Sequence, residues 1–388
     1  MNKSLIALAA MAAMSHAQAD VEVAAGLKLY GVFDQGLMRQ SVASASSTVR
    51  AYSNTGFFAS SSTSRFGVKG ERDLTEGYKG MVQFEQEITP DESTLMPAKN
   101  RTAFVGLANE TAGALRLGTQ ETPAYVLFGS DANGRAEYKP QLWRYLAGSA
   151  TQDRANNAFK YTSPKFGPLT VDLMRGYGET NVGNTSGTAQ TGDFKSWGVN
   201  YNAGPLQAKL VWDSITNTEL KYALPGEINA GVLSYSSTAT SNTTTQYKTK
   251  MIASSTSSPL QRQFLAASYD FGAAKINYIM ANASTSGKGE VKTNTVGIRI
   301  PMDKITLALS VGSGTYSDAA AYSGVAKIAG NLEDTTFGAY YNFDKSTAAY
   351  FLSSRSKNTV IQSTGDTDHT AGTVGKSNTS TLGLRYNY

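Results

Sequence analysis

The strongest constraint on the fold is a two-residue alternation of apolar with polar or small side chains. The clearest run is 305–312, where apolar residues occupy every second position: Ile305, Leu307, Leu309 and Val311. The same alternation occurs over 27–34, 196–201 and 295–300. Residues two apart lie on one face of a strand, so each run predicts a strand with one apolar face. We find no sustained helical periodicity and, after Asp20, no 18-residue apolar run that would predict a transmembrane helix.

Two kinds of connection alternate between these runs. Short turns lie near 73–77, 109–113, 163–168, 202–205, 270–273, 301–304 and 342–346. Longer segments rich in Ser, Thr, Asn and Gly cover 40–64, 90–99, 120–153, 177–193, 214–260, 282–290, 313–331 and 356–377. Regular alternation of the two kinds predicts sixteen strands, with every short turn at one end of the sheet.

A soluble β-sandwich would also show alternation, but it would not require short and long connections to alternate. Most short turns have an aromatic residue beside them: Tyr78, Phe166, Tyr201, Tyr269, Phe271, Tyr341 and Phe343. Aromatic residues at strand ends are typical of the interfacial girdles of membrane barrels. We therefore predict an all-β fold, a 16-stranded antiparallel transmembrane β-barrel with short periplasmic turns and long extracellular loops.

The first nineteen residues have the features of a secretory signal. Lys3 precedes the apolar run 5–14, and Ala17-Gln18-Ala19 forms a small–x–small cleavage pattern. An N-terminal helix packed on a domain is the alternative, but the segment has no polar face. We expect residues 1–19 to be a signal peptide and 20–388 to form one barrel domain, exported to the outer membrane of a Gram-negative bacterium.

Cysteine and histidine, which commonly act as nucleophiles, general bases or metal ligands, are scarce in this chain. The chain has no cysteine and two histidines, and only His369 lies outside the expected leader. Thiol nucleophiles and Cys/His zinc sites are therefore excluded. An outer-membrane hydrolase would need a histidine beside a nucleophile or a carboxylate array. Because His369 lies in a Ser/Thr/Gly-rich segment, we expect a non-enzymatic protein without a cofactor, a metal or a nucleic-acid partner.

The C-terminal segment continues the alternation to the last residue. Apolar or aromatic side chains occupy every second position: Leu382, Leu384, Tyr386 and Tyr388. We interpret these residues as a barrel-insertion signal that the barrel-assembly machinery reads. A strand that happens to end the chain is the alternative.

Several segments resemble general diffusion porins of Gram-negative bacteria, in particular the β-proteobacterial branch. The similar segments are 29–34, 64–71, 82–85, 100–107, 115–118 and 383–385, together with Asp73, Leu74 and Gly77 in the first hairpin and Arg154, Asn156, Asn157, Tyr161, Ser163, Pro164 and Phe166 after the third loop. The resemblance implies a sixteen-stranded barrel, a third loop folded into the lumen, and a homotrimer whose contact uses the first strands and the second loop. Two residues depart from the family pattern. Tyr388 replaces a terminal Phe, and Thr119 stands where relatives often have a basic residue.

In a pore the decisive chemistry is the size and charge of the narrowest point. Strand alternation predicts a lumenal basic wall that comprises Arg65, Lys69, Arg101, Arg116 and Arg154. Other residues expected to face the lumen are Lys28, Asp34, Glu71, Gln83, Glu85, Asn156 and Lys160. In the segment 101–105 we expect Phe104 to face outward and Arg101, Ala103 and Val105 to face inward.

The third long segment carries acidic residues that could oppose this wall: Glu121, Asp131 and Glu137. Opposed charges across a narrow lumen would create a transverse field that orients polar solutes. Some of the arginines could instead form salt bridges near the rim. The whole chain has a formal net charge of +5, and without Lys3 of the expected leader the charge is +4. Together with this charge, the basic wall predicts a mild preference for anions.

We therefore expect a channel in outer-membrane lipid for passive diffusion of small hydrophilic solutes and ions. A substrate-specific channel or an adhesin on the same barrel is the alternative. The longest connection, 214–260, has three tyrosines among many Ser and Thr residues: Tyr222, Tyr235 and Tyr247. Such a loop could bind a ligand or shield the surface, since both kinds of loop share this composition.

Overall fold

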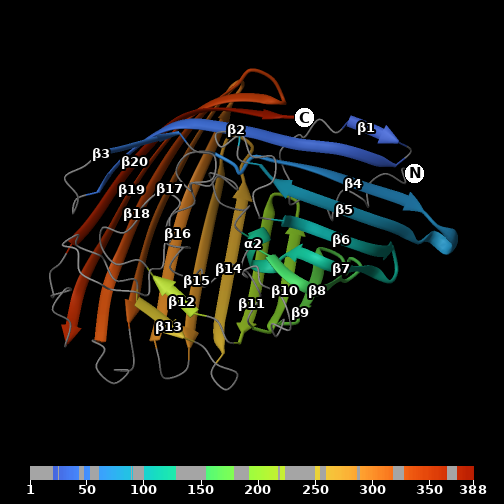
Figure 1. Ribbon diagram of the computed structural model, residues 1–388, viewed down its shortest axis with the longest axis horizontal. Helices are drawn as coiled ribbons and strands as arrows, with labels where there is room; N and C mark the ends of the chain where they lie inside the picture. Colours follow the sequence, from blue (N-terminus) through green and yellow to red (C-terminus); the bar gives the residue numbers. More distant parts are fainter. Residues whose placement is uncertain are drawn as a thin grey trace.

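The computed structural model describes residues 21–24, 26–42, 48–52, 61–88, 90, 100–127, 154–178, 192–216, 219–222, 250–253, 259–285, 289–317, 327–364 and 374–388. Within these ranges, sixteen long antiparallel strands form one sheet that closes on itself (Figure 1). The predicted all-β barrel is therefore confirmed. The expected leader, Asp131, Glu137 and His369 lie outside the described residues.

The strands follow each other around the barrel in chain order. The sixteen long strands are β2 (Leu27–Val42), β4 (Arg65–Asp73), β5 (Lys79–Glu87), β6 (Asn100–Asn109), β7 (Gly113–Glu121), β8 (Arg154–Thr162), β9 (Leu169–Gly176), β10 (Phe194–Ala203), β11 (Leu206–Ile215), β14 (Leu260–Asp270), β15 (Lys275–Thr285), β16 (Gly289–Met302), β17 (Ile305–Ser317), β18 (Lys327–Asn342), β19 (Thr347–Thr364) and β20 (Val374–Asn387). The shorter elements are β1 (Val21–Ala24), β3 (Thr48–Tyr52), η1 (Thr75–Gly77), α2 (Pro123–Leu127), β12 (Glu219–Tyr222) and β13 (Lys250–Ala253).

The barrel closes between its first and last long strands. Along β20, β2 pairs in register from Val32 opposite Asn387 to Val42 opposite Ser377. Just beyond this ladder, Gly31 and Tyr388 exchange two backbone hydrogen bonds, of 2.9 and 3.1 Å. The other edge of β2 pairs with β4 near the short turns and with β3 near the long connections. Closure therefore leaves no open sheet edge at this seam. An open edge would expose unpaired backbone groups to lipid, which is costly.

All seven short turns lie where the sequence predicts them, between consecutive long strands. The long connections are shorter than predicted in three places. We expected loops over 282–290, 313–331 and 356–377, whereas β15 to β20 continue deep into these segments. The reason is that the outward side chains there are Ser, Thr, Asn and charged residues. These polar outward positions remove the apolar alternation without ending the strand.

Three tyrosines of the inner wall lie on glycines directly opposite them in the neighbouring strand. The pairs are Tyr30 with Gly67, Tyr316 with Gly330, and Tyr350 with Gly383. A Cβ at Gly383 would lie 2.2 Å from the Tyr350 ring, and a Cβ at Gly67 would lie 2.5 Å from the Tyr30 ring. The glycines are therefore required for these rings to pack, as in the aromatic rescue of strand glycines.

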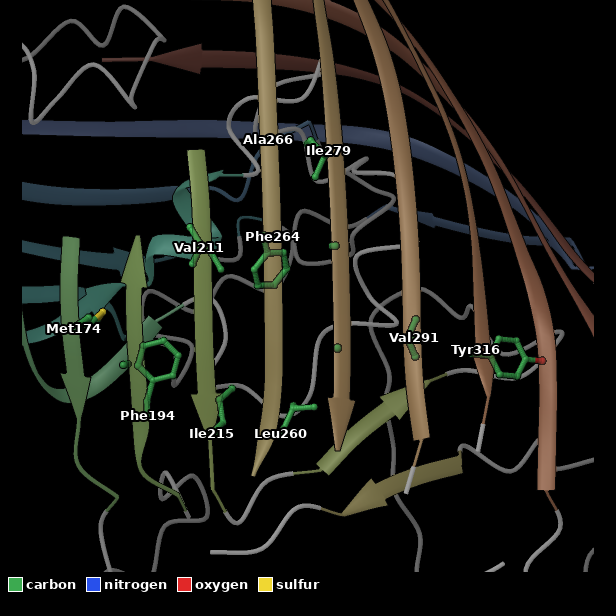
Figure 2. Close-up of a cluster of buried hydrophobic side chains, with 14 of the residues drawn as sticks. Met174, Phe194, Val211, Ile215, Leu260, Phe264, Ala266, Ile279, Val291 and Tyr316 are labelled. Carbon is green, nitrogen blue, oxygen red and sulfur yellow. The ribbon is translucent and has the colours of Figure 1, made fainter. Parts of the chain in front are cut away.

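Much of the inner wall from β9 to β18 is apolar and buried. Figure 2 labels ten residues of this cluster: Met174, Phe194, Val211, Ile215, Leu260, Phe264, Ala266, Ile279, Val291 and Tyr316. The short helix α2, which begins the third long connection, contributes Ala124 to the same cluster. A Cβ on Gly198 in β10 would lie 3.5 Å from the Pro123 side chain. The start of the third connection therefore turns into the barrel.

Candidate functional site

The outer face of the barrel carries an apolar band. In β20, Leu382 and Leu384 are 59% and 62% exposed, whereas Thr381, on the opposite face of the strand, is 1% exposed. Aromatic residues gather at the short-turn end of this band, where Tyr269 packs on Phe271 with ring centroids 4.6 Å apart. Such an arrangement matches a surface that meets hydrocarbon and ends in an interfacial aromatic girdle.

The Glu85 carboxylate is the centre of a charged cluster on the inner wall. Arg101 donates a hydrogen bond from Nε to Glu85, and the same guanidinium lies 3.7 Å from Glu87. Arg65 approaches Glu85 Oε2 at 3.4 Å, and the Tyr30 hydroxyl donates to the same oxygen at 3.2 Å. Two arginines from the predicted basic wall therefore share a buried carboxylate from β5.

The position of Arg101 depends on an irregularity that the sequence alone does not reveal. Between Phe84 and Gln86 the register of β5 with β6 shifts by one residue. Beyond this bulge the alternation is reversed: Val105 is 61% exposed on the outer face, and Phe104 lies inward beneath a guanidinium. The expectation that Phe104 faces outward and Val105 inward was wrong, because a bulge changes the phase of a strand.

Arg154 lies at the start of β8, beside the third connection. Its Nη2 donates to Glu121 Oε1 at 3.2 Å, and its guanidinium stacks over the Tyr125 ring at 5.1 Å. Glu121 ends β7 and Tyr125 belongs to α2. The structure thus brings together one residue of the predicted basic wall and one of the predicted acids of the third connection.

Arg116 lies lower on the wall, towards the short turns. Its guanidinium lies 5.8 Å from the centre of the Phe104 ring, and its Nη1 donates to Thr162 Oγ1 at 3.4 Å. In the part of the chain that the structure describes, no carboxylate lies within ion-pair distance of Arg116. Lys160 stands directly opposite Arg116 in β8 and donates from Nζ to the Glu121 carbonyl at 3.3 Å.

Four more predicted lumenal residues belong to β2, β4 and β5: Lys28, Lys69, Glu71 and Gln83. The ammonium group of Lys69 lies over the Tyr30 ring at 4.9 Å, and Gln83 donates to the Tyr30 hydroxyl at 2.6 Å. Lys28 stands opposite Lys69, and Lys28 and Glu71 are both exposed.

Asp34 is buried at the seam where the barrel closes. Its carboxylate accepts hydrogen bonds from the Ser61 hydroxyl and, at 2.5 Å, from the Tyr350 hydroxyl. Asn156 lies in a bulge of β8 with Asn157, whose φ is +45°, and both side chains are exposed. Strand alternation therefore does not apply at Asn156.

Sequence reasoning missed a second set of charged residues, on β9 to β20. Asp172 accepts hydrogen bonds from Thr162 at 2.8 Å and Asn200 at 3.0 Å, and Lys209 lies 3.8 Å from it. Asp213 pairs with Arg262 at 2.5 Å. Two further inward cations on this arc are Arg299 and Arg385. Extending the alternation argument beyond the sixth long strand, β8, would have found most of them.

The described residues contain no group of three or more His, Cys, Asp or Glu side chains arranged to hold a metal ion. They also include no helix long and apolar enough to cross a membrane.

A closed sixteen-stranded barrel with an apolar outer band and a charged inner wall defines the class of outer-membrane β-barrels. A family model described as "Gram-negative porin" matches residues 4–360. The chain belongs to this porin family, and its location is therefore the outer membrane.

Curated relatives match part of the chain. Outer membrane porin protein 32 of Delftia acidovorans is 31% identical over 223 residues, which cover 54% of this chain and 59% of the relative. An outer membrane porin protein of Bordetella pertussis is 25% identical over 255 residues, or 61% of this chain and 64% of the relative. In each case the match spans less than two thirds of the relative.

Solved structures match nearly the whole fold. An anion-selective porin from Comamonas acidovorans has a TM-score of 0.66 at 21% identity, with 93% of this chain and 99% of that chain covered. OmpT of Vibrio cholerae has a TM-score of 0.62 at 16% identity, with 95% of this chain and 100% of that chain covered.

Proposed function

We propose that this protein forms a water-filled channel through which small hydrophilic solutes and ions diffuse passively across the outer membrane. The observation that carries the proposal is the separation of faces: apolar side chains form a band on the outside of a closed barrel, and the charged clusters lie on its inner wall beside the apolar cluster of β9 to β18. Passive diffusion needs no bond-making step, so the proposal gives the protein no catalytic role.

The channel is expected to prefer anions mildly. On the described inner wall, basic side chains outnumber the carboxylates that face them, and Arg116 has no carboxylate within ion-pair distance among those residues. Cations near a low-dielectric wall raise the local concentration of anions. The selectivity that the name of the Comamonas porin states points in the same direction.

The third connection is proposed to narrow the channel. Its first helix, α2, packs against β10 and β11, and Glu121 already contacts Arg154. Under this proposal Glu121, Asp131 and Glu137 face the basic wall of Arg65, Lys69, Arg101, Arg116 and Arg154. Glu85 and Glu87 modify the field, because they neutralise part of that wall from within.

Export, assembly and association follow the family pattern in this proposal. Residues 1–19 act as a signal peptide, and the barrel-assembly machinery reads Leu382, Leu384, Tyr386 and Tyr388. Three copies associate through the outer faces of the first strands and the second connection. The long connections then lie outside the cell and the short turns in the periplasm.

Conductance across a planar bilayer tests the channel itself. Purified protein should add discrete steps of conductance whose current is linear in voltage. Saturable block of that current by one solute would instead favour a substrate-specific channel, and absence of steps from correctly folded protein would contradict a pore.

A further inference from the structure

The outer face of β19 and β20 carries a group of basic residues near the long connections. Arg355 and Lys357 alternate with the buried Ser354 and Ser356, so they point away from the lumen. Lys376 in β20 is exposed on the same outer face. We call these three residues, Arg355, Lys357 and Lys376, the outer basic cluster.

The register brings the three cations together. Lys376 stands directly opposite Lys357, and Arg355 stands opposite Asn378, one outward pair nearer the apolar band. Side chains directly opposite have Cβ atoms about 5 Å apart and diagonal ones about 7–8 Å apart, and like charges at these separations repel. Repulsion of this kind is relieved when an anion lies between the cations.

The residues that the structure describes supply only part of the compensating charge. Glu333 in β18 pairs with Lys357 at 3.0 Å. Neither Arg355 nor Lys376 has a hydrogen bond or an ion pair with the residues that the structure describes. Among the described residues, no carboxylate therefore compensates these two outward cations.

The position of the cluster relative to the apolar band identifies the region of the membrane that it meets. Phe351 and Leu382 face each other on the outer side and are both largely exposed, and Arg355 lies four positions beyond Phe351 towards the long connections. That separation is about 14 Å along a strand. Because a basic side chain is costly at mid-membrane and tolerated near the interface, the cluster lies at the level of the lipid headgroups.

We propose that the outer basic cluster binds the phosphate of a phosphorylated glycolipid headgroup in the outer leaflet. Arg355 and Lys376 contact the phosphate oxygens, which guanidinium and ammonium groups bind with charge-assisted hydrogen bonds. Ser353 and Ser380 lie between the cluster and the apolar band, and Asn378 stands opposite Arg355; these residues offer hydroxyl and amide groups to the sugar. The inferred lipid site does not depend on the channel activity. It depends only on the proposed orientation of the barrel, in which the long connections lie outside the cell.

The test uses the full-length refolded protein in an uncharged detergent and native mass spectrometry. The probes are a bisphosphorylated diglucosamine acyl glycolipid and the same glycolipid without phosphates. The variants are the double substitution R355Q/K376Q and the control K345Q, which removes an exposed lysine from a short turn. A basic residue at a lipid surface strengthens binding about fivefold, so the double variant should bind the phosphorylated probe roughly 25-fold more weakly. The wild type and K345Q should both bind it more tightly than the phosphate-free probe.

Equal binding of both probes by the wild type would overturn the proposal, as would unchanged affinity in the double variant. Displacement of the glycolipid by an equal concentration of inorganic phosphate would show a free-anion site instead. A changed oligomeric state with unchanged lipid binding would show a contact between copies of the chain. Conductance is recorded in parallel, so a protein that binds lipid without forming a pore would contradict the channel and leave the lipid site standing.

Discussion

Arg101 and Glu85 form an ion pair on the inner wall, although they stand in neighbouring strands whose register shifts between them. The same carboxylate lies 3.4 Å from Arg65. Two guanidinium groups therefore share the Glu85 carboxylate, and the charge that a passing ion meets depends on all three residues.

Replacing the shared carboxylate should increase the preference for anions. E85Q removes one negative charge from the wall and leaves both arginines, so the anion-to-cation permeability ratio should rise about twofold, the effect of one charge roughly 8 Å away in water that contains about 0.1 M salt. The zero-current potential in a KCl gradient measures this ratio. E290Q is the matched control, because Glu290 lies on the outer face of β16. A shift towards cations in E85Q would contradict this placement of Glu85.

Removing Arg116 should have the opposite effect. Arg116 rests on Phe104 and Thr162 without a carboxylate at ion-pair distance among the described residues, so R116Q removes a cation that no close anion neutralises there. The permeability ratio should fall by about a factor of two. K345Q, which removes a lysine from a short turn, should leave the ratio unchanged. An unaltered ratio in R116Q would show that ions do not pass close to this side chain.

The case of Arg101 shows what strand alternation can and cannot predict. Alternation placed Arg101 inward on the assumption that Phe104 faces outward. Phe104 in fact faces inward, and Arg101 also faces inward because the bulge opposite Phe84–Gln86 changes the phase of the strand between them. A bulge adds one residue to one strand, and the pattern of apolar residues around 100–107 does not show which residue is added. Where strands are regular, as in β16 and β17, alternation predicts the inner and outer faces correctly.

Single cysteines test this reversed phase directly, because the chain has no native cysteine. In liposomes a charged, water-soluble thiosulfonate should modify R101C and F104C through the lumen and reduce the conductance. V105C should react only with an apolar maleimide that enters lipid. Rapid modification of V105C by the charged reagent, with F104C protected, would show that β6 has no bulge and would contradict the reversed phase.

A methyl group added at Gly383 should destabilise the seam of the barrel. In G383A the new Cβ would lie 2.2 Å from the Tyr350 ring, whose hydroxyl donates to Asp34. Overpacking of this kind lowers the free energy of unfolding by about 1–3 kcal/mol. Urea unfolding followed by heat-modifiable gel mobility measures the change. G80A is the control, because its nearest neighbour would lie 3.6 Å away. Equal stability of the two variants would mean that the ring can move without cost.

The pairing partners within the wall were the least predictable part of the site. Glu85 and Arg65 are twenty positions apart, and Asp213 and Arg262 are separated by a long connection. Alternation assigns a face to each residue, but ion pairs also require the register between strands. That register depends on bulges and on packed pairs such as Tyr350 on Gly383, which are tertiary features. The number of strands was predictable, because turn chemistry is local.

The zero-current potential of the wild-type channel tests the central claim most directly. With purified protein in a planar bilayer and a KCl gradient, the potential should have the sign of a mildly anion-selective pore, because cations such as Arg116 line its wall. A potential of the opposite sign would contradict the account of the basic wall, since a cation-selective pore requires the carboxylates to dominate the lumen.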